Sequence, residues 1–128
     1  MSKDLFDIGS KLAGCPDVRT YVPGKRLRVF FTCPDVTCHS PLEAECRMFI
    51  RQNLGEDVHI MKHEAETCDM CVYIPREDKR VSRGMWSEIE TFFSRFAEEA
   101  RVYEFDATEQ QLIARNPTYF RNPRRVVT

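Results

Sequence analysis

The chain has 128 residues, of which 42% are hydrophobic and 30% are charged, and its formal net charge is −1. This length and composition are typical of one soluble globular domain with its own hydrophobic core. A nearly balanced charge argues against nucleic acid as the main partner. No apolar segment is long enough to span a membrane and the first residues lack a signal-peptide core, so we expect a cytoplasmic protein without a membrane partner.

Cysteine usage bears on metal binding. The six cysteines are Cys15, Cys33, Cys38, Cys46, Cys68 and Cys71. In the absence of a signal peptide we expect reduced thiols. A zinc site would draw on Cys33, Cys38, Cys68 and Cys71, with His39 or His63 as a substitute. The first pair is more widely spaced than in the usual zinc signature, so we expect no metal or other cofactor and small buried cysteines instead.

The first 26 residues precede the main domain. Leu5, Ile8 and Leu12 have the spacing of one face of a short helix. Pro23 and Gly24 mark a turn after it. We therefore expect an N-terminal helix or arm over residues 1–26, and it stays open whether this arm covers a sheet edge.

A strand, a helix and a second strand are predicted next. The β-branched and aromatic run from Leu27 to Cys33 predicts a strand that Pro34 ends. Ser40-Pro41-Leu42-Glu43 has the form of a capping box with proline at the first helical position. Gly55 ends that helix, and the alternating residues 58–63 predict the second strand.

The central stretch predicts a buried strand, a charged loop and a helix. It begins at Asp69, and the apolar run from Met70 to Ile74 is typical of a buried strand. The following helix begins near Gly84, with Glu88 in or near its first turn. Ligands of open α/β sheets bind where such strands lead into helices, so we expect the site here.

Residues 102–106 form the last predicted strand, the fourth in all. Strands that alternate with helices predict an α/β domain with a mainly parallel sheet covered on both faces. We expect this core over residues 27–107 and a basic C-terminal tail over residues 108–128. The tail either packs Tyr119 and Phe120 against the body or offers its arginines to a phosphate or a neighbouring subunit.

The central stretch also resembles a known family. Asp69, the run Val72-Tyr73-Ile74-Pro75 and the pattern Gly84-Met85-x-x-Glu88-Ile89 are similar to the core of the nucleoside 2-deoxyribosyltransferases, whose relatives include deoxynucleoside monophosphate N-glycosidases. The resemblance covers roughly residues 27–107. It implies a flavodoxin-like three-layer sandwich of four to five strands. It also implies cleavage or transfer at the N-glycosidic bond of a (deoxy)nucleoside or nucleotide.

The resemblance implies roles for individual residues. Glu88 would be the nucleophile that stabilises the oxocarbenium-like transition state, and the helix N-terminus would help to keep it ionised. Asp69 or Asp78 would protonate the leaving base or orient it. The implied substrate-binding residues are Cys33, Asp35, Tyr73, Gly84, Met85, Trp86 and Arg121.

Plainer interpretations of the same residues stay open. Asp69 could cap a turn, Glu88 could be a solvated helix residue, and Trp86 could belong to the core. The alternative function is a non-catalytic domain of the same fold that binds a nucleotide, a nucleotide-derived signal or another protein. The expected partner is a nucleoside or nucleotide, and a homo-oligomer could complete the site.

Overall fold

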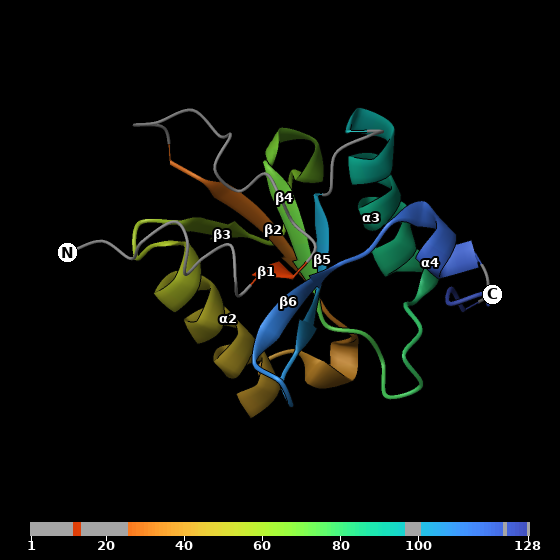
Figure 1. Cartoon of the computed structure of the whole chain (residues 1–128), viewed down its shortest axis with the longest axis horizontal. Helices are drawn as coiled ribbons and strands as arrows, with labels where there is room; N and C mark the ends of the chain where they lie inside the picture. The colour runs from red at the N-terminus through yellow and green to blue at the C-terminus, as the bar shows by residue number, and fades with distance from the viewer. Residues whose placement is uncertain (1–11, 14–25, 97–100, 122, 128) are drawn as a thin grey trace.

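The computed structural model describes residues 12–13, 26–96, 101–121 and 123–127, and Figure 1 shows their arrangement. These residues form a six-stranded sheet in the order β1-β6-β5-β4-β2-β3. The strands are β1 (Leu12–Ala13), β2 (Arg28–Thr32), β3 (His59–Met61), β4 (Met70–Tyr73), β5 (Val102–Asp106) and β6 (Gln111–Ala114). Strands β2 to β5 are parallel, whereas β6 runs antiparallel to β5. The predicted α/β fold with a mainly parallel sheet is confirmed, and β1 adds a two-residue strand to the expected four to five.

Two helices cover opposite faces of this sheet. Helix α2 (Pro41–Leu54) lies on one face and α3 (Arg83–Arg95) on the other, as Figure 1 shows. Successive residues of a strand point to opposite faces. Met70 and Val72 therefore pack into the core under α2, while Cys71 and Tyr73 pack into the core under α3. This double burial explains why β4 appears in the sequence as an unbroken apolar run.

Local signals define α2 as predicted. The Ser40 hydroxyl accepts a hydrogen bond from the Glu43 N–H at 3.3 Å, and Pro41 occupies the first turn. The helix ends at Gly55, whose φ of 123° disfavours any side chain. The second half of the capping box differs from the prediction, because the Glu43 carboxylate accepts from the His39 N–H at 2.9 Å.

Helix α3 begins at Arg83, one residue before the predicted start, with the Ser82 hydroxyl as its N-cap. Glu88 is thereby the sixth residue of the helix and lies in its second turn. Of the two positions that the sequence allowed, in or near the first turn, the structure shows the second. The field of a helix N-terminus falls off within the first turn, so it gives Glu88 little help in staying ionised.

The C-terminal segment contributes to the sheet and the core. The sequence did not reveal β6, which pairs with β5 within residues 108–128, the segment expected to form a tail. Helix α4 (Pro117–Arg121) follows, and Phe120 is buried in the core under α3 with Tyr119 packed against it. Val126 then pairs with Val81. The interpretation in which Tyr119 and Phe120 pack against the body is confirmed.

Two connecting segments are short 3₁₀ helices, η2 (Asp35–Thr37) and η3 (Ala65–Thr67). The predicted N-terminal helix lies outside the described residues, except that Leu12 belongs to β1. None of the helices in the described residues is long and apolar enough to cross a membrane.

Candidate functional site

A cavity of about 930 Å³ lies outside the carboxyl ends of the parallel strands. Its walls are residues 34–37 after β2, residues 74–79 after β4 and residues 105–108 at the end of β5, with Ser40 and Leu42 of the α2 start. We call it the carboxyl-edge cavity. The chain leaves β2 through α2 toward β3 and leaves β4 through α3 toward β5, so the crossovers diverge between these neighbouring strands. Open α/β sheets bind ligands at such a switch point.

The acidic side chains around this cavity differ in their hydrogen-bond and ion-pair partners. Asp78 accepts hydrogen bonds from the Arg80 N–H at 3.0 Å and the Arg80 Nε at 3.2 Å, and it lies 3.7 Å from the Arg76 guanidinium. The backbone hydrogen bond from Arg80, with the nearby guanidinium groups, lowers the pKa of Asp78. Of the two roles that the resemblance implied for Asp78, the lowered pKa favours orienting the base over donating a proton to it. Asp35 and Glu77 also line the cavity, and their carboxylates have no hydrogen-bond partner among the described residues.

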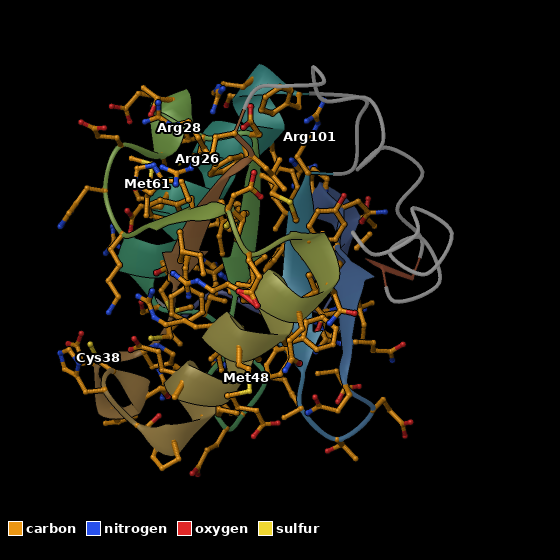
Figure 2. All side chains as sticks on the ribbon, turned by 90° about the vertical axis from the view of Figure 1, so that its left-hand side faces the viewer. Arg26, Arg28, Cys38, Met48, Met61 and Arg101 are labelled. Carbon is orange, nitrogen blue, oxygen red and sulfur yellow. The ribbon has the colours of Figure 1, made fainter. Side chains whose placement is uncertain are left out.

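Asp69 lies at the other edge of the sheet. It precedes β4, and its carboxylate accepts a hydrogen bond from the Arg28 N–H at 2.8 Å. Figure 2 shows Arg28 and Cys38 at opposite ends of the molecule, and Cys38 directly follows the η2 wall of the cavity. The geometry gives Asp69 a structural contact that the sequence did not predict, because its carboxylate joins the starts of β2 and β4 and does not cap a turn.

Glu88 lies on α3, on the opposite side of the sheet from α2. It is partly buried, and among the described residues it has no hydrogen bond or ion pair. Burial raises the pKa of Glu88, and the nearby His63 partly opposes that rise. Glu88 in turn helps to raise the pKa of the buried Cys71 thiol, after burial itself. The carboxylate thus lies between α3 and the β3–β4 side of the sheet, and it lines neither cavity described here.

The raised pKa of Glu88 predicts a pH-dependent cost to stability. A carboxyl group with a raised pKa in the folded state contributes most stability below its unfolded pKa and loses it as pH rises through the folded pKa. We expect Glu88→Gln to increase the free energy of unfolding at pH 7, by no more than about 1 kcal/mol because solvent screens the group. Urea unfolding at pH 7 and pH 4 measures this, and the difference should shrink at pH 4. A variant that is less stable than the wild type at pH 7 would show that the carboxylate has a stabilising partner.

Three other predicted substrate-binding residues lie in or near the core. Tyr73 is fully buried and its hydroxyl donates to Glu104 at 2.9 Å, so it lies away from either cavity. Met85 is buried under α3. Cys33 is partly buried beside the α2-side core, and burial, followed by the Glu43 charge, raises the pKa of its thiol to about 11. Its thiol is therefore protonated at neutral pH.

Trp86 and Arg121 line a second cavity, of about 690 Å³, between α3 and the C-terminal segment. Arg83 and Arg124 line it as well, and none of the three arginines has an ion pair among the described residues. The Trp86 ring packs 5.1 Å from the Phe120 ring, so it belongs partly to the core. Gly84 is exposed nearby, with no atom within 4 Å of where a Cβ would lie, so no close approach requires glycine there.

The sequence missed a polar cluster at the carboxyl end of β2. Glu43 is 6% exposed, and its carboxylate accepts from the Arg47 Nε at 2.8 Å and from the Lys62 ammonium at 3.4 Å. Burial alone would raise the pKa of Glu43, but the His39 N–H, Arg47 and Lys62 outweigh it and lower the pKa to about 2. The only sequence signal was the glutamate of the capping box, whose partners 4 and 19 residues away were not evident.

The four cysteines considered for zinc do not converge. Cys33 packs beside the α2-side core, whereas Cys68 and Cys71 are buried in the α3-side core. The Cys68 thiol lies 3.5 Å from the Glu64 carbonyl oxygen and 3.7 Å from the Met61 sulfur. The sheet thus separates the two halves of that predicted site.

The candidate site residues predicted from the sequence do not lie together in one cavity. Asp35 and Asp78 lie at the carboxyl-edge cavity, Trp86 and Arg121 lie at the second cavity, and Glu88 lies at neither. Comparisons of the chain with models of protein families, with curated proteins and with solved structures found no match.

Proposed function

We propose that the protein binds a nucleoside or nucleotide in the carboxyl-edge cavity. The observation that carries this proposal is the position of the cavity, outside the ends of β2 and β4 where the crossovers diverge. Its volume of about 930 Å³ is within the range of small-molecule sites, roughly 300–1,000 Å³.

The chemistry of the cavity walls suits such a ligand. Val36, Leu42 and Pro75 supply exposed or partly exposed apolar surface for the face of a base. The Asp35 and Glu77 carboxylates are free to accept hydrogen bonds from sugar hydroxyls or base N–H groups. Lys79, which also lines the cavity, offers an ammonium group for a phosphate.

Calorimetric titration of the purified chain with a panel of deoxynucleosides, ribonucleosides and their monophosphates tests this proposal. Asp35→Asn and Glu77→Gln should each weaken binding about 10- to 100-fold, since each removes a charged hydrogen-bond acceptor. Glu56→Gln, at an exposed carboxylate outside the cavity, should bind as the wild type does. Unchanged affinity in both cavity variants, or no binding by any member of the panel, would contradict the proposal.

Cleavage or transfer at the N-glycosidic bond is the second candidate, with Glu88 as the catalytic carboxylate. Glu88 is a partly buried carboxylate without a partner among the described residues, and groups with a pKa perturbed by burial are enriched at functional sites. The direction of this shift opposes the ionised form that attack requires. In this reaction Glu88 would attack C1′ while the N-glycosidic bond breaks and its electron pair passes to the base, which takes up a proton from water. Water or an acceptor base would then attack C1′ and release Glu88.

The two candidates differ in where the ligand must reach. Binding alone requires only the walls of the carboxyl-edge cavity. Turnover requires the sugar to meet Glu88, which lies on the α3 side near His63. Variants at Asp35 and at Glu88 therefore separate the two functions.

A further inference from the structure

We propose that Cys38, His39 and Glu43, completed by Cys33, bind one zinc ion or a similar divalent transition metal. A sulfur of Cys38, a ring nitrogen of His39 and a carboxylate oxygen of Glu43 all lie within 4.8 Å of one another. The Cys33 sulfur lies outside this group of three but is 3.9 Å from the Glu43 Oε1 atom. Zinc bond lengths place neighbouring ligand atoms of a tetrahedral site about 3.3–3.8 Å apart. Small side-chain movements would bring the Cys38, His39 and Glu43 donors to these distances, and Cys33 would have to turn its side chain toward them to complete the set.

The ligand types select the class of metal. Two thiols, an imidazole and a carboxylate match the sulfur, nitrogen and oxygen donors that Zn²⁺ accepts in four-coordinate sites. Mg²⁺ and Ca²⁺ prefer sets made of oxygen alone. All four donors come from the β2–α2 connection and the start of α2, which is a compact segment of the chain.

Supporting contacts orient the Glu43 carboxylate toward this cluster. Arg47 holds the Oε2 atom at 2.8 Å. The Oε1 atom faces Cys33 and receives the His39 N–H. A metal-ligating carboxylate is commonly held in this way by a hydrogen bond to its other oxygen.

A lysine ammonium lies among the same donor atoms. The Lys62 Nζ is 3.5 Å from the Cys38 sulfur and 3.4 Å from the Glu43 Oε1 atom. The cluster therefore already attracts a positive charge. Because the Lys62 side chain is 35% exposed and flexible, it can move into solvent when a divalent ion displaces it.

A bound ion would fix one wall of the carboxyl-edge cavity. The 3₁₀ helix η2, which contains Asp35, connects Cys33 to Cys38, and Asp35 lines that cavity. The inference stands apart from the proposed function, because its test requires no nucleoside.

Titration of the reduced, metal-free full-length chain with Co²⁺ tests the site. We expect one ion per chain, with the visible bands of tetrahedral cobalt and a thiolate-to-cobalt band in the near ultraviolet, and displacement by Zn²⁺. Cys38→Ser and His39→Asn should weaken binding at least about 10-fold. Asparagine suits position 39 because His39 has a φ of 64°. The matched control His63→Asn, at an exposed histidine outside the cluster, should leave the affinity unchanged.

Lys62→Met gives a sharper result. Removing the competing ammonium should tighten Co²⁺ binding about 2- to 5-fold, which corresponds to the interaction free energy of a partly exposed ion pair. Co²⁺ binding that appears only in Lys62→Met would overturn the proposal. It would show that in the wild-type protein the Lys62 ammonium always occupies the place of the metal ion. The proposal also fails if cobalt shows no thiolate band, or if His63→Asn weakens binding as much as His39→Asn.

Discussion

Replacing Glu104 with alanine is expected to lower the free energy of unfolding by about 3–5 kcal/mol, the cost of breaking a buried charged network. Glu104 is 4% exposed in the middle of β5. Its Oε1 atom accepts from the Tyr73 hydroxyl at 2.9 Å, the Tyr119 hydroxyl at 3.2 Å and the Arg115 Nε at 3.4 Å. Burial and the Glu104 charge raise the pKa of Tyr73 well above its usual value, so its hydroxyl stays protonated and donates. Alanine would leave these donors without their acceptor.

The same network attaches the C-terminal segment to the sheet. The Tyr119 ring lies between two guanidinium groups, with the Arg115 carbon 3.9 Å and the Arg125 carbon 4.3 Å from its centroid. Loss of Glu104 removes one contact of Tyr119 and one of Arg115 together. We therefore expect the variant to loosen α4, which adds to the loss of global stability.

Urea unfolding followed by circular dichroism measures the effect. Glu104→Gln keeps an acceptor for Tyr73 and should cost less than the alanine variant. Glu109→Ala, at an exposed carboxylate three residues beyond β5, should change stability by less than about 0.5 kcal/mol. A loss below about 1 kcal/mol in Glu104→Ala would show that water or a rearranged side chain satisfies the donors.

Glu88→Gln is expected to reduce N-glycosidic turnover on the order of 10³-fold or more, if this chain cleaves or transfers that bond. Glutamine has nearly the same shape but cannot carry the negative charge that stabilises an oxocarbenium-like transition state or attack C1′ as a carboxylate. The fold should remain intact, because Glu88 has no hydrogen bond or ion pair among the described residues. Lost turnover with unchanged or greater stability is the signature of a side chain retained for chemistry.

The measurement is release of free base from deoxynucleosides and their monophosphates, with and without an acceptor base, followed by chromatography. Dependence on the acceptor separates transfer from hydrolysis. Glu90→Gln, two residues further along the same helix and exposed, is the matched control and should keep wild-type turnover. Base release that survives in Glu88→Gln would exclude Glu88 as the nucleophile. Absence of release in the wild type, with nucleoside binding that depends on Asp35, would leave binding as the function.

Local chemistry explains why much of the fold could be predicted. The Ser40 cap, Pro41 and Gly55 specify α2 through interactions within a few residues. The buried run of β4 reflects a central strand with both faces covered. The strand β6 was missed because it has only four residues and begins at the polar Gln111, so that its hydrogen bonds to β5 are what make it a strand.

Tertiary structure alone decided which side chains meet. Asp69 and Glu88 are close to the same strand in the sequence, but the direction of β4 puts Asp69 at the amino edge of the sheet and α3 brings Glu88 back along its face. Glu104 accepts a hydrogen bond from Tyr73, which lies on the neighbouring strand β4, 31 residues away in the sequence. Lys62 reaches Cys38 across 24 residues because β3 lies beside β2.

The sequence by itself determined the alternating strands and helices, the limits of α2 and the parallel sheet, because burial periodicity and capping act over a few residues. The tertiary structure decided the carboxyl-edge cavity, the Glu104 network and the Cys38–Glu43 cluster. The cavity and the Glu104 network depend on strand order and crossover direction, which bring together residues that no local pattern connects. The Cys38–Glu43 cluster lies within one short segment, and the sheet adds only Lys62 to it.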